Sequence, residues 1–277
     1  IKSFTGDKKL FLGKGGISNP DGLKKVRLNN SSGFGSTNCI AIQIDIELDS
    51  MSSKEIVLNL GVCENIIDGK NMAYKYNKIQ NCKQELEAVK RKWKDTLERL
   101  QVYTPIESMN IMLNGWALYQ TISSRLYGRT GFYQSGGAYG FRDQLQDTLC
   151  LKYTNPNKVK EQIIKHSMHQ FIEGDVEHWW HEETSRGIRT RFSDDLLWLP
   201  FVVEEYIEAT GDSEILEIKT PYLQGEVLKE DEEERYDLYK SSEIQGSIYD
   251  HSIRAIEKTL NFGEHGIPKI GTGDWND

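Results

Sequence analysis

The stretch GFYQSGGAYGFRDQLQD, residues 131–147, contains the sharpest change from loop to helix in the chain. Its first half is rich in glycine and aromatic residues, and a helix is expected to begin at Arg142. Leu145 and Leu149 lie four residues apart and therefore form an apolar stripe on one face of that helix. The pattern predicts an amphipathic helix that packs on a core and carries the loop at its N-terminal end.

The chain downstream of about residue 106 repeats this helical character. Helices are expected over residues 109–125, 142–153, 158–171, 213–222 and 249–260. Ser193 is expected to cap a further helix, because a serine side chain can accept from the first backbone N–H groups. No strand pattern alternates with these segments, so a parallel α/β sheet is not expected. The predicted fold is mainly α.

The chain before residue 106 has a different pattern, which predicts strands first and then one long helix. Apolar and polar residues alternate over 39–48 and again over 55–62, which is typical of half-buried strands. Leucine, valine and tryptophan recur at helical spacing over 83–101, and Pro105 ends that helix. We therefore expect the end of a β domain over residues 1–80, a helical linker over 81–105 and a helical domain over 106–277.

Composition and charge restrict the classes of function. The 277 residues carry a net charge of −8, which argues against nucleic acid or an anionic membrane surface as the main partner. The four cysteines match no zinc spacing and predict free thiols in a reducing compartment. No apolar run reaches the length of a membrane helix. The chain starts at Ile1 and stops within a motif, so we expect it to be part of a longer protein.

Two motifs crowd carboxylates against aromatic rings and amides, as sugar sites do. Asp143 and Asp147 lie four residues apart on one helix face, where two like charges destabilise a helix by about a few tenths of a kcal/mol. A role in binding would explain why both are present, and this is one interpretation. A favourable interaction with the helix dipole is the other. The final residues, DWND, place Asp277 near the indole of Trp275. Partial desolvation favours a neutral carboxyl, which is what a general acid requires, although a plain turn would have the same sequence.

Two further motifs carry open alternatives. EGDVEHWWH, residues 173–181, could offer aromatic rings to a sugar, bind a metal through His178 and His181, or simply pack on the core. The spacing of the two histidines fits no standard metal motif. In GIRTRFSDD, residues 187–195, Arg189 and Arg191 could clamp an anion or pair with the two aspartates that follow them.

These motifs, in this order, resemble glycoside hydrolase family 94, the inverting β-glucoside phosphorylases. The stretches that carry the resemblance are GFYQSGGAYGFRDQLQD, EGDVEHWWH, GIRTRFSDDLLWLP and HGIPKIGTGDWND. The chain is most similar to the branch of β-1,2-oligoglucan phosphorylases and of the C-terminal end of cyclic β-1,2-glucan synthases. The resemblance implies the tail of a β-sandwich, a helical linker and the first half of an (α/α)6 barrel.

The resemblance also implies roles for individual residues. Asp277 would be the general acid, and Trp275 would line the subsite of the transferred glucosyl unit. Arg142 and Asp143 would hold hydroxyls of the same sugar. Four further residues lie in matching motifs and are carried over as substrate-binding candidates: Gln134, Asp147, Trp180 and Asp195. In relatives, the residues that hold phosphate lie in the second half of the barrel, so none is expected here.

The activity implied is phosphorolysis of a β-glucan to α-glucose 1-phosphate, with inorganic phosphate as co-substrate and no cofactor or metal. The expected partners are a β-glucan oligosaccharide, phosphate and a second copy in a homodimer, in the cytoplasm and without direct membrane contact. Two alternatives stay open. One is an inverting hydrolase with Asp143 or Asp147 as base, and the other is a non-catalytic β-glucan-binding module.

Overall fold

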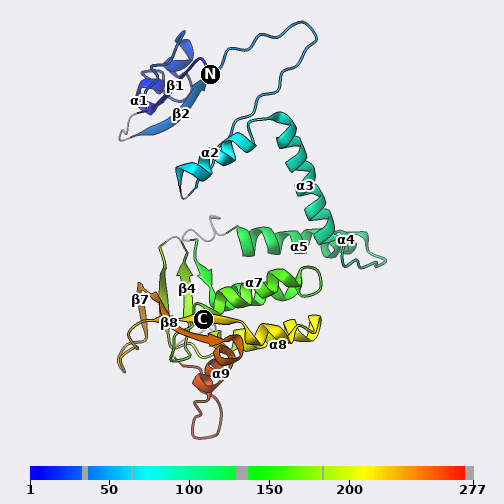
Figure 1. Ribbon diagram of the computed structural model, residues 1–277, viewed down its shortest axis with the longest axis vertical. Coiled ribbons are helices and arrows are strands. Elements are labelled where there is room, and N and C mark those ends of the chain that lie inside the picture. Colours follow the sequence, from blue (N-terminus) through cyan, green and yellow to red (C-terminus); the bar gives the residue numbers. More distant parts are fainter. Residues whose placement is uncertain (33–36, 64, 129–136, 183, 272–277) are drawn as a thin grey trace. The chain divides into compact units, whose positions relative to one another are not determined.

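The computed structural model describes residues 1–32, 37–63, 65–128, 137–182 and 184–271 (Figure 1). The chain divides into two compact units, residues 1–85 and 86–277. The division falls within the long helix α3 (Ile79–Leu97), which matches the helix expected over 83–101.

The first unit is built on a short antiparallel sheet. Strand β1 pairs with β2, with Ser3 opposite Gln43. Its elements are β1 (Ser3–Asp7), α1 (Lys8–Leu12), the 3-10 turn η1 (Asp21–Lys24), β2 (Asn38–Gln43) and α2 (Ile66–Lys75). The expected strand over 39–48 is therefore present but ends early, and the one expected over 55–62 is wrong, because those residues form no ladder within the described chain. Helix α2 was not expected from the sequence, and the Asn65 side chain caps its first turn.

The second unit contains most of the helices expected from the sequence, with small shifts of their ends. The helix expected over 213–222 is wrong, because residues 213–217 form a 3-10 turn and residues 219–222 belong to a strand. The helices of this unit are α4 (Glu107–Ile111), α5 (Ala117–Gln120), α6 (Phe141–Thr148), α7 (Pro156–Ser167), α8 (Trp198–Thr210) and α9 (Ile248–Thr259). Helices α4 and α5 belong to one run that includes the wider π turns η2 (Met112–Trp116) and η3 (Thr121–Tyr127). The 3-10 turns η4 (Leu149–Leu151), η5 (Asp195–Leu197) and η6 (Ser213–Glu217) complete the set.

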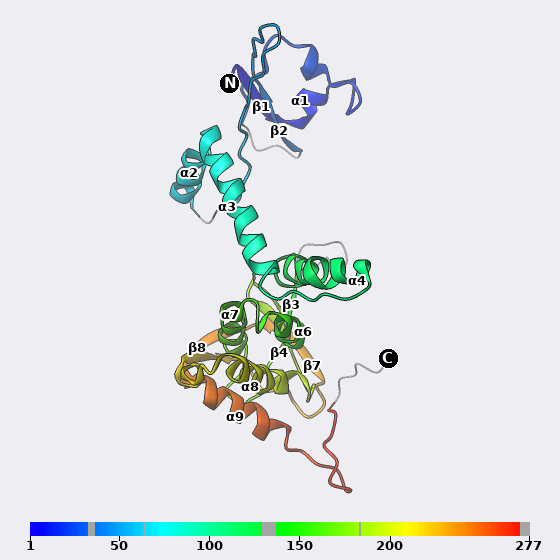
Figure 2. The ribbon, with the colours of Figure 1, turned by 90° about the vertical axis from the view of Figure 1, so that its right-hand side faces the viewer.

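A single main core holds these helices together. Helices α6, α7 and α8 pack in contact with one another, and α9 packs on α8. Both views place α7, α8 and α9 side by side (Figures 1 and 2). Phe141 and Leu145 of α6, Ile163 of α7, Leu199 of α8 and Ile248 of α9 are all fully buried in this core. The apolar stripe read from the spacing of Leu145 is thus confirmed as a core-facing surface.

Two antiparallel sheets interrupt the helices, and neither was expected from the sequence. One has the strand order β3-β4-β5-β7, and the other pairs β6 with β8. The strands are β3 (Tyr139–Gly140), β4 (Glu177–His181), β5 (Arg186–Thr190), β6 (Lys219–Gln224), β7 (Glu234–Leu238) and β8 (Lys240–Ser247). No parallel α/β sheet was expected, and the sheets of the described residues are indeed antiparallel. The strands themselves were not expected, because most are short and EHWWH, with one tryptophan on each face, shows no alternation.

Two serines near the starts of helices differ in whether they act as caps. Ser247 caps α9 in a capping box with Asp250. Ser193, in contrast, caps nothing, because its hydroxyl donates to the carbonyl of Ile270 at 2.7 Å. That bond joins the segment before α8 to the segment that leads into the last residues of the chain.

Candidate functional site

Helix α6 presents two of the expected sugar-binding side chains at its N-terminus. Gly140, in an extended conformation, precedes the helix, and Phe141 and Leu145 anchor it in the core. Arg142 and Asp143 follow in the first turn and remain partly exposed. An acidic residue in this position interacts favourably with the positive end of the helix dipole.

Arg125, a residue that the sequence analysis did not single out, explains the two like charges on α6. Its Nε donates to Asp147 at 2.8 Å and its Nη2 donates to Asp143 at 3.1 Å. One guanidinium therefore bridges both carboxylates and offsets their repulsion. Arg125 lies in η3, which is separated from α6 in the sequence by residues 128–140, and no local pattern connects it with α6.

Arg142 joins the first motif to the third. Its Nη1 donates to Asp194 Oδ2 at 3.1 Å, and its guanidinium lies 5.4 Å from the centre of the Trp198 ring. The ion pair is half-exposed, with side-chain exposures of 28% and 46%, so its contribution to stability is modest. Its main effect is to hold the N-terminal end of α6 against the turn η5.

Asp195 is buried beneath this surface and bound to a histidine. Its side chain is 1% exposed, and its Oδ2 lies 2.6 Å from Nδ1 of His178 on β4. Burial raises the pKa of Asp195, and the hydrogen bond to His178 opposes that rise. Its second oxygen is buried without a hydrogen-bond partner among the described residues, so it can accept from a hydroxyl or water. The ring of Phe192 stacks on His178 at 4.3 Å.

The adjacent tryptophans of β4 differ in their surroundings. Trp180 is 1% exposed and stacks between His169, at 3.7 Å, and Tyr139, at 5.8 Å. Both of its faces are therefore occupied by protein, which argues against its expected contact with a sugar. Trp179 is partly exposed and packs beside Tyr236 of β7. The interpretation as core packing thus applies to Trp180 and the interpretation as an accessible ring applies to Trp179.

The side chains considered for a metal site and for an anion site make other contacts within the described residues. Within the described residues, only three glutamates of α8, Glu204, Glu205 and Glu208, group closely enough to hold an ion, and neither His178 nor His181 belongs to that group.

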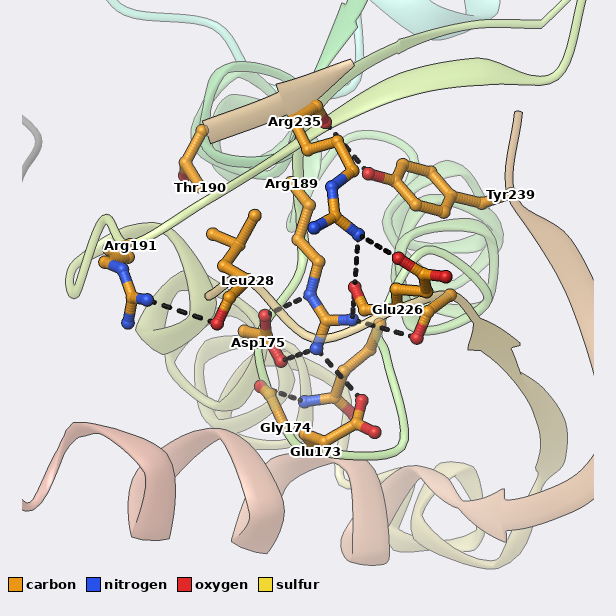
Figure 3. A network of polar contacts seen from close by, with 12 residues as sticks. Glu173, Gly174, Asp175, Arg189, Thr190, Arg191, Glu226, Leu228, Arg235 and Tyr239 are labelled. Carbon is orange, nitrogen blue, oxygen red and sulfur yellow. Dashed lines mark hydrogen bonds and ion pairs between the residues drawn. The ribbon is translucent and has the colours of Figure 1, made fainter. Parts of the chain in front are cut away.

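The two arginines of the third motif neither clamp an anion nor pair with Asp194 and Asp195. Arg189 is fully buried and binds both oxygens of Asp175, at 2.6 and 2.7 Å (Figure 3). Arg191 donates to backbone carbonyls of the segment 228–232.

The remaining expected site residues lie outside the described residues. They are Gln134, in 129–136, and Trp275 and Asp277, in 272–277. The chain leading to Asp277 is described as far as Gly271, which lies so close to the carbonyl of Arg191 that a Cβ would approach it to 2.0 Å.

Comparison with known proteins assigns the family. Residues 92–277 match the glycosyl hydrolase 94 superfamily catalytic domain, and residues 1–79 match the glycosyl hydrolase 94 supersandwich domain. The chain belongs to the glycosyl hydrolase 94 superfamily. The resemblance read from the four motifs is thereby confirmed, as is the combination of a helical catalytic domain with a β domain.

Individual glycosyl hydrolase 94 relatives include a synthase and phosphorylases. The chain is 35% identical to the cyclic beta-(1,2)-glucan synthase NdvB of Rhizobium meliloti over 280 residues, which is 100% of the chain and 10% of the synthase. It is 23% identical to N,N'-diacetylchitobiose phosphorylase of Vibrio furnissii, over 99% of the chain and 36% of that protein. It is 26% identical to 1,2-beta-oligoglucan phosphorylase of Listeria innocua, over 52% of the chain and 13% of that protein. The chain thus spans about a third or less of each.

Within this glycosyl hydrolase 94 chain, the described helices contain none that is long and apolar enough to cross a membrane. All four cysteines are free. The geometry adds Arg125 and His178 to the expected site region, and it places Tyr236 beside Trp179 on the sheet. The sequence held no local signal for Arg125 or Tyr236, whereas His178 stands within a motif that was singled out.

Proposed function

We propose that the full-length protein is an inverting phosphorylase of β-linked glucans, or carries that activity as one domain of a cyclic glucan synthase. The observation that carries the proposal is the convergence of motifs far apart in the sequence. Arg142 pairs with Asp194, Asp195 binds His178, and Gly271 lies against the segment that precedes Asp194. Carboxylates, a guanidinium and an imidazole at one surface form a set that can bind the hydroxyls of a sugar.

In the proposed reaction, Asp277 donates a proton to the glycosidic oxygen while a phosphate oxygen attacks the anomeric carbon from the opposite face. The bond from that carbon to the glycosidic oxygen breaks as the bond to phosphate forms. A β-glucoside therefore gives α-glucose 1-phosphate and a glucan shorter by one unit. Trp275, Gln134, Arg142 and Asp143 would hold the transferred glucosyl unit.

A single acid suffices because the nucleophile is already ionised. A phosphate group has a second pKa of about 6, so it needs positioning and no general base. A hydrolase would need a second carboxylate to activate water. Asp143 and Asp147 are the expected candidates for that base, and both are ion-paired with Arg125. Their pairing supports phosphorolysis over hydrolysis.

Membership of the glycosyl hydrolase 94 superfamily also supports proposals on the domains, the glucan, the location and the oligomeric state. We propose that residues 106–277 form the first half of an (α/α)6 barrel, after a sandwich tail over 1–80 and a linker over 81–105. The preferred glucan is β-1,2-linked, as the names of the synthase and of the oligoglucan phosphorylase suggest. We also propose a cytoplasmic location, which free cysteines favour, a homodimer, and phosphate as the only co-reactant.

The test is an assay of the full-length protein with β-1,2-gluco-oligosaccharides, with and without phosphate. We expect α-glucose 1-phosphate to form only with phosphate, and the variant Asp277→Asn to lose this product. Asp231→Asn, which changes an exposed aspartate, is the matched control and should retain it. Free glucose released without phosphate would support a hydrolase instead. Binding without any product, even with other β-linkages, would support a non-catalytic module.

A further inference from the structure

The sheet β3-β4-β5-β7 has one face that the site described above does not use. Trp179 of β4 lies opposite Ile188 of β5, which lies opposite Tyr236 of β7. In the next row, His181 pairs with Arg186. Residues directly opposite one another in an antiparallel sheet point their side chains to the same side. Three aromatic rings from two non-adjacent strands therefore gather on one face.

The two faces of this sheet differ in exposure. On the inner face, Trp180 is 1% exposed and Arg189 is fully buried. On the outer face, Tyr236 is 47% exposed, and Trp179 and His181 are partly exposed, whereas Ile188, which lies between Trp179 and Tyr236 in the register, is 7% exposed. A large aromatic surface that remains accessible to solvent is commonly a binding surface.

The rings on the outer face form one continuous group. The centre of the Trp179 ring lies 5.5 Å from Tyr236 and 5.4 Å from His181, and the Arg186 guanidinium lies 6.0 Å from the centre of the Tyr236 ring. We call Trp179, His181, Arg186 and Tyr236 the outer platform. Each member combines a flat surface with polar N–H or O–H groups at its edge.

We propose that the outer platform binds the glucan chain beyond the glucosyl unit that reacts. The C–H faces of sugar rings pack on aromatic faces, and sugar hydroxyls bond to the polar edges. The inference rests on the proposed function for its ligand. Its location follows from the fold, because Trp179 pairs with Gly140, two residues before Arg142, so the platform begins at the strand that leads into α6.

The charge of the chain favours a neutral polysaccharide over other ligands that use aromatic rings. Single-stranded nucleic acid also stacks on such rings, but it needs a positive groove. Here the net charge is −8, and the outer face carries a single cation, Arg186, among its four platform residues. A glucan has no charge to neutralise, so rings and a few donors are sufficient.

Polar contacts surround β7, the strand that carries Tyr236. Arg189 donates to the carbonyls of Gly225 and Glu226, and Arg235 binds Glu226 at 3.1 Å (Figure 3). The hydroxyl of Tyr239 donates to the carbonyl of Arg235 at 2.8 Å. Together with the pairing of β7 with β5, these bonds hold the strand, and a platform on a fixed strand loses little entropy on binding.

The experiment compares Tyr236→Ala and Trp179→Ala with the unaltered full-length protein. Retention on β-1,2-glucan in affinity electrophoresis measures binding without turnover, and KM for phosphorolysis is measured for the shortest and for long oligosaccharides. We expect each variant to weaken retention and to raise KM for long chains by about three- to tenfold, with a smaller change for the shortest substrate. Tyr236→Phe keeps the ring and should retain most binding. Tyr249→Ala, which removes another exposed tyrosine, is the matched control.

Each outcome of this experiment supports or overturns the binding of glucan to the outer platform. Unchanged retention and unchanged KM for long chains in both alanine variants would overturn the inference. So would equal effects on short and long substrates, which would assign the rings to the reacting sugar or to folding. A changed oligomeric state with unchanged glucan binding would mean that the platform contacts protein. If the unaltered protein forms no sugar phosphate but its retention still depends on Tyr236, the proposed reaction fails and the platform stands.

Discussion

The substitution Arg189→Met tests how much the buried ion pair between β5 and Asp175 stabilises the second unit. The Arg189 side chain is fully buried, binds both oxygens of Asp175, and lies 3.9 Å over the ring of Phe171. Asp175 has only 11% of its side chain exposed, so removal of the guanidinium leaves a buried carboxylate without its partner. Glu173, the other partner, is 33% exposed and can turn to water.

These contacts set the expected magnitude. Breaking a buried ion pair by removing one partner costs about 3–5 kcal/mol. We therefore expect Arg189→Met to lower the free energy of unfolding by about 4 kcal/mol. Arg189→Lys keeps the charge but loses the fork that binds both oxygens, and should cost about 2 kcal/mol. Removing Asp175 as well takes away the stranded charge, so the double variant Arg189→Met/Asp175→Asn should cost less than the sum of the single changes.

Urea unfolding of the full-length protein, followed by circular dichroism and tryptophan fluorescence, measures these differences. Lys90→Ala is the control, because the Lys90–Glu87 pair has 60% of both side chains exposed and should contribute less than about 0.5 kcal/mol. A loss below about 1 kcal/mol for Arg189→Met would refute the reasoning, since it would mean that the buried pair has no net effect. Strictly additive single and double variants would refute the assignment of the cost to a stranded carboxylate.

Three further predictions concern other parts of the second unit. Burial lowers the pKa of His251 from 6.5 to about 4, so the folded state disfavours its protonation and stability should fall as pH drops from about 6.5 to about 4. The loss from this residue should reach about 3 kcal/mol, and His251→Gln should reduce the pH dependence of the unfolding midpoint over that range. Arg125→Gln should lower kcat/KM by about ten- to a hundredfold with little change in melting temperature, because Arg125 orients Asp143 and Asp147 at a partly exposed site. A large loss of stability with unchanged kinetics would contradict this prediction. Because Trp180 is buried and Trp179 is partly exposed, Trp180→Ala should lower the free energy of unfolding by about 4 kcal/mol and Trp179→Ala by clearly less. Denaturant unfolding measures both losses, and equal losses would contradict the prediction.

The sequence alone determined the family and most helices. Four motifs in order identified the superfamily before any geometry was known. Helical spacing over 83–101 and over 249–260 gave α3 and α9, because a helix with one buried face repeats its apolar residues every three to four positions. The Asp277 assignment also comes from the sequence alone, and it stays a prediction.

The tertiary structure decided which side chains meet. Arg125 with Asp147, Arg142 with Asp194, and Trp179 with Tyr236 are each separated by more than 20 residues. Spacing within one element reports which face is buried, but it carries no information on the partner across the contact. For the same reason, the pair Trp179-Trp180 could not be divided from the sequence into an accessible ring and a core ring. That division follows from the direction of β4 within its sheet, because successive residues of a strand point to opposite faces.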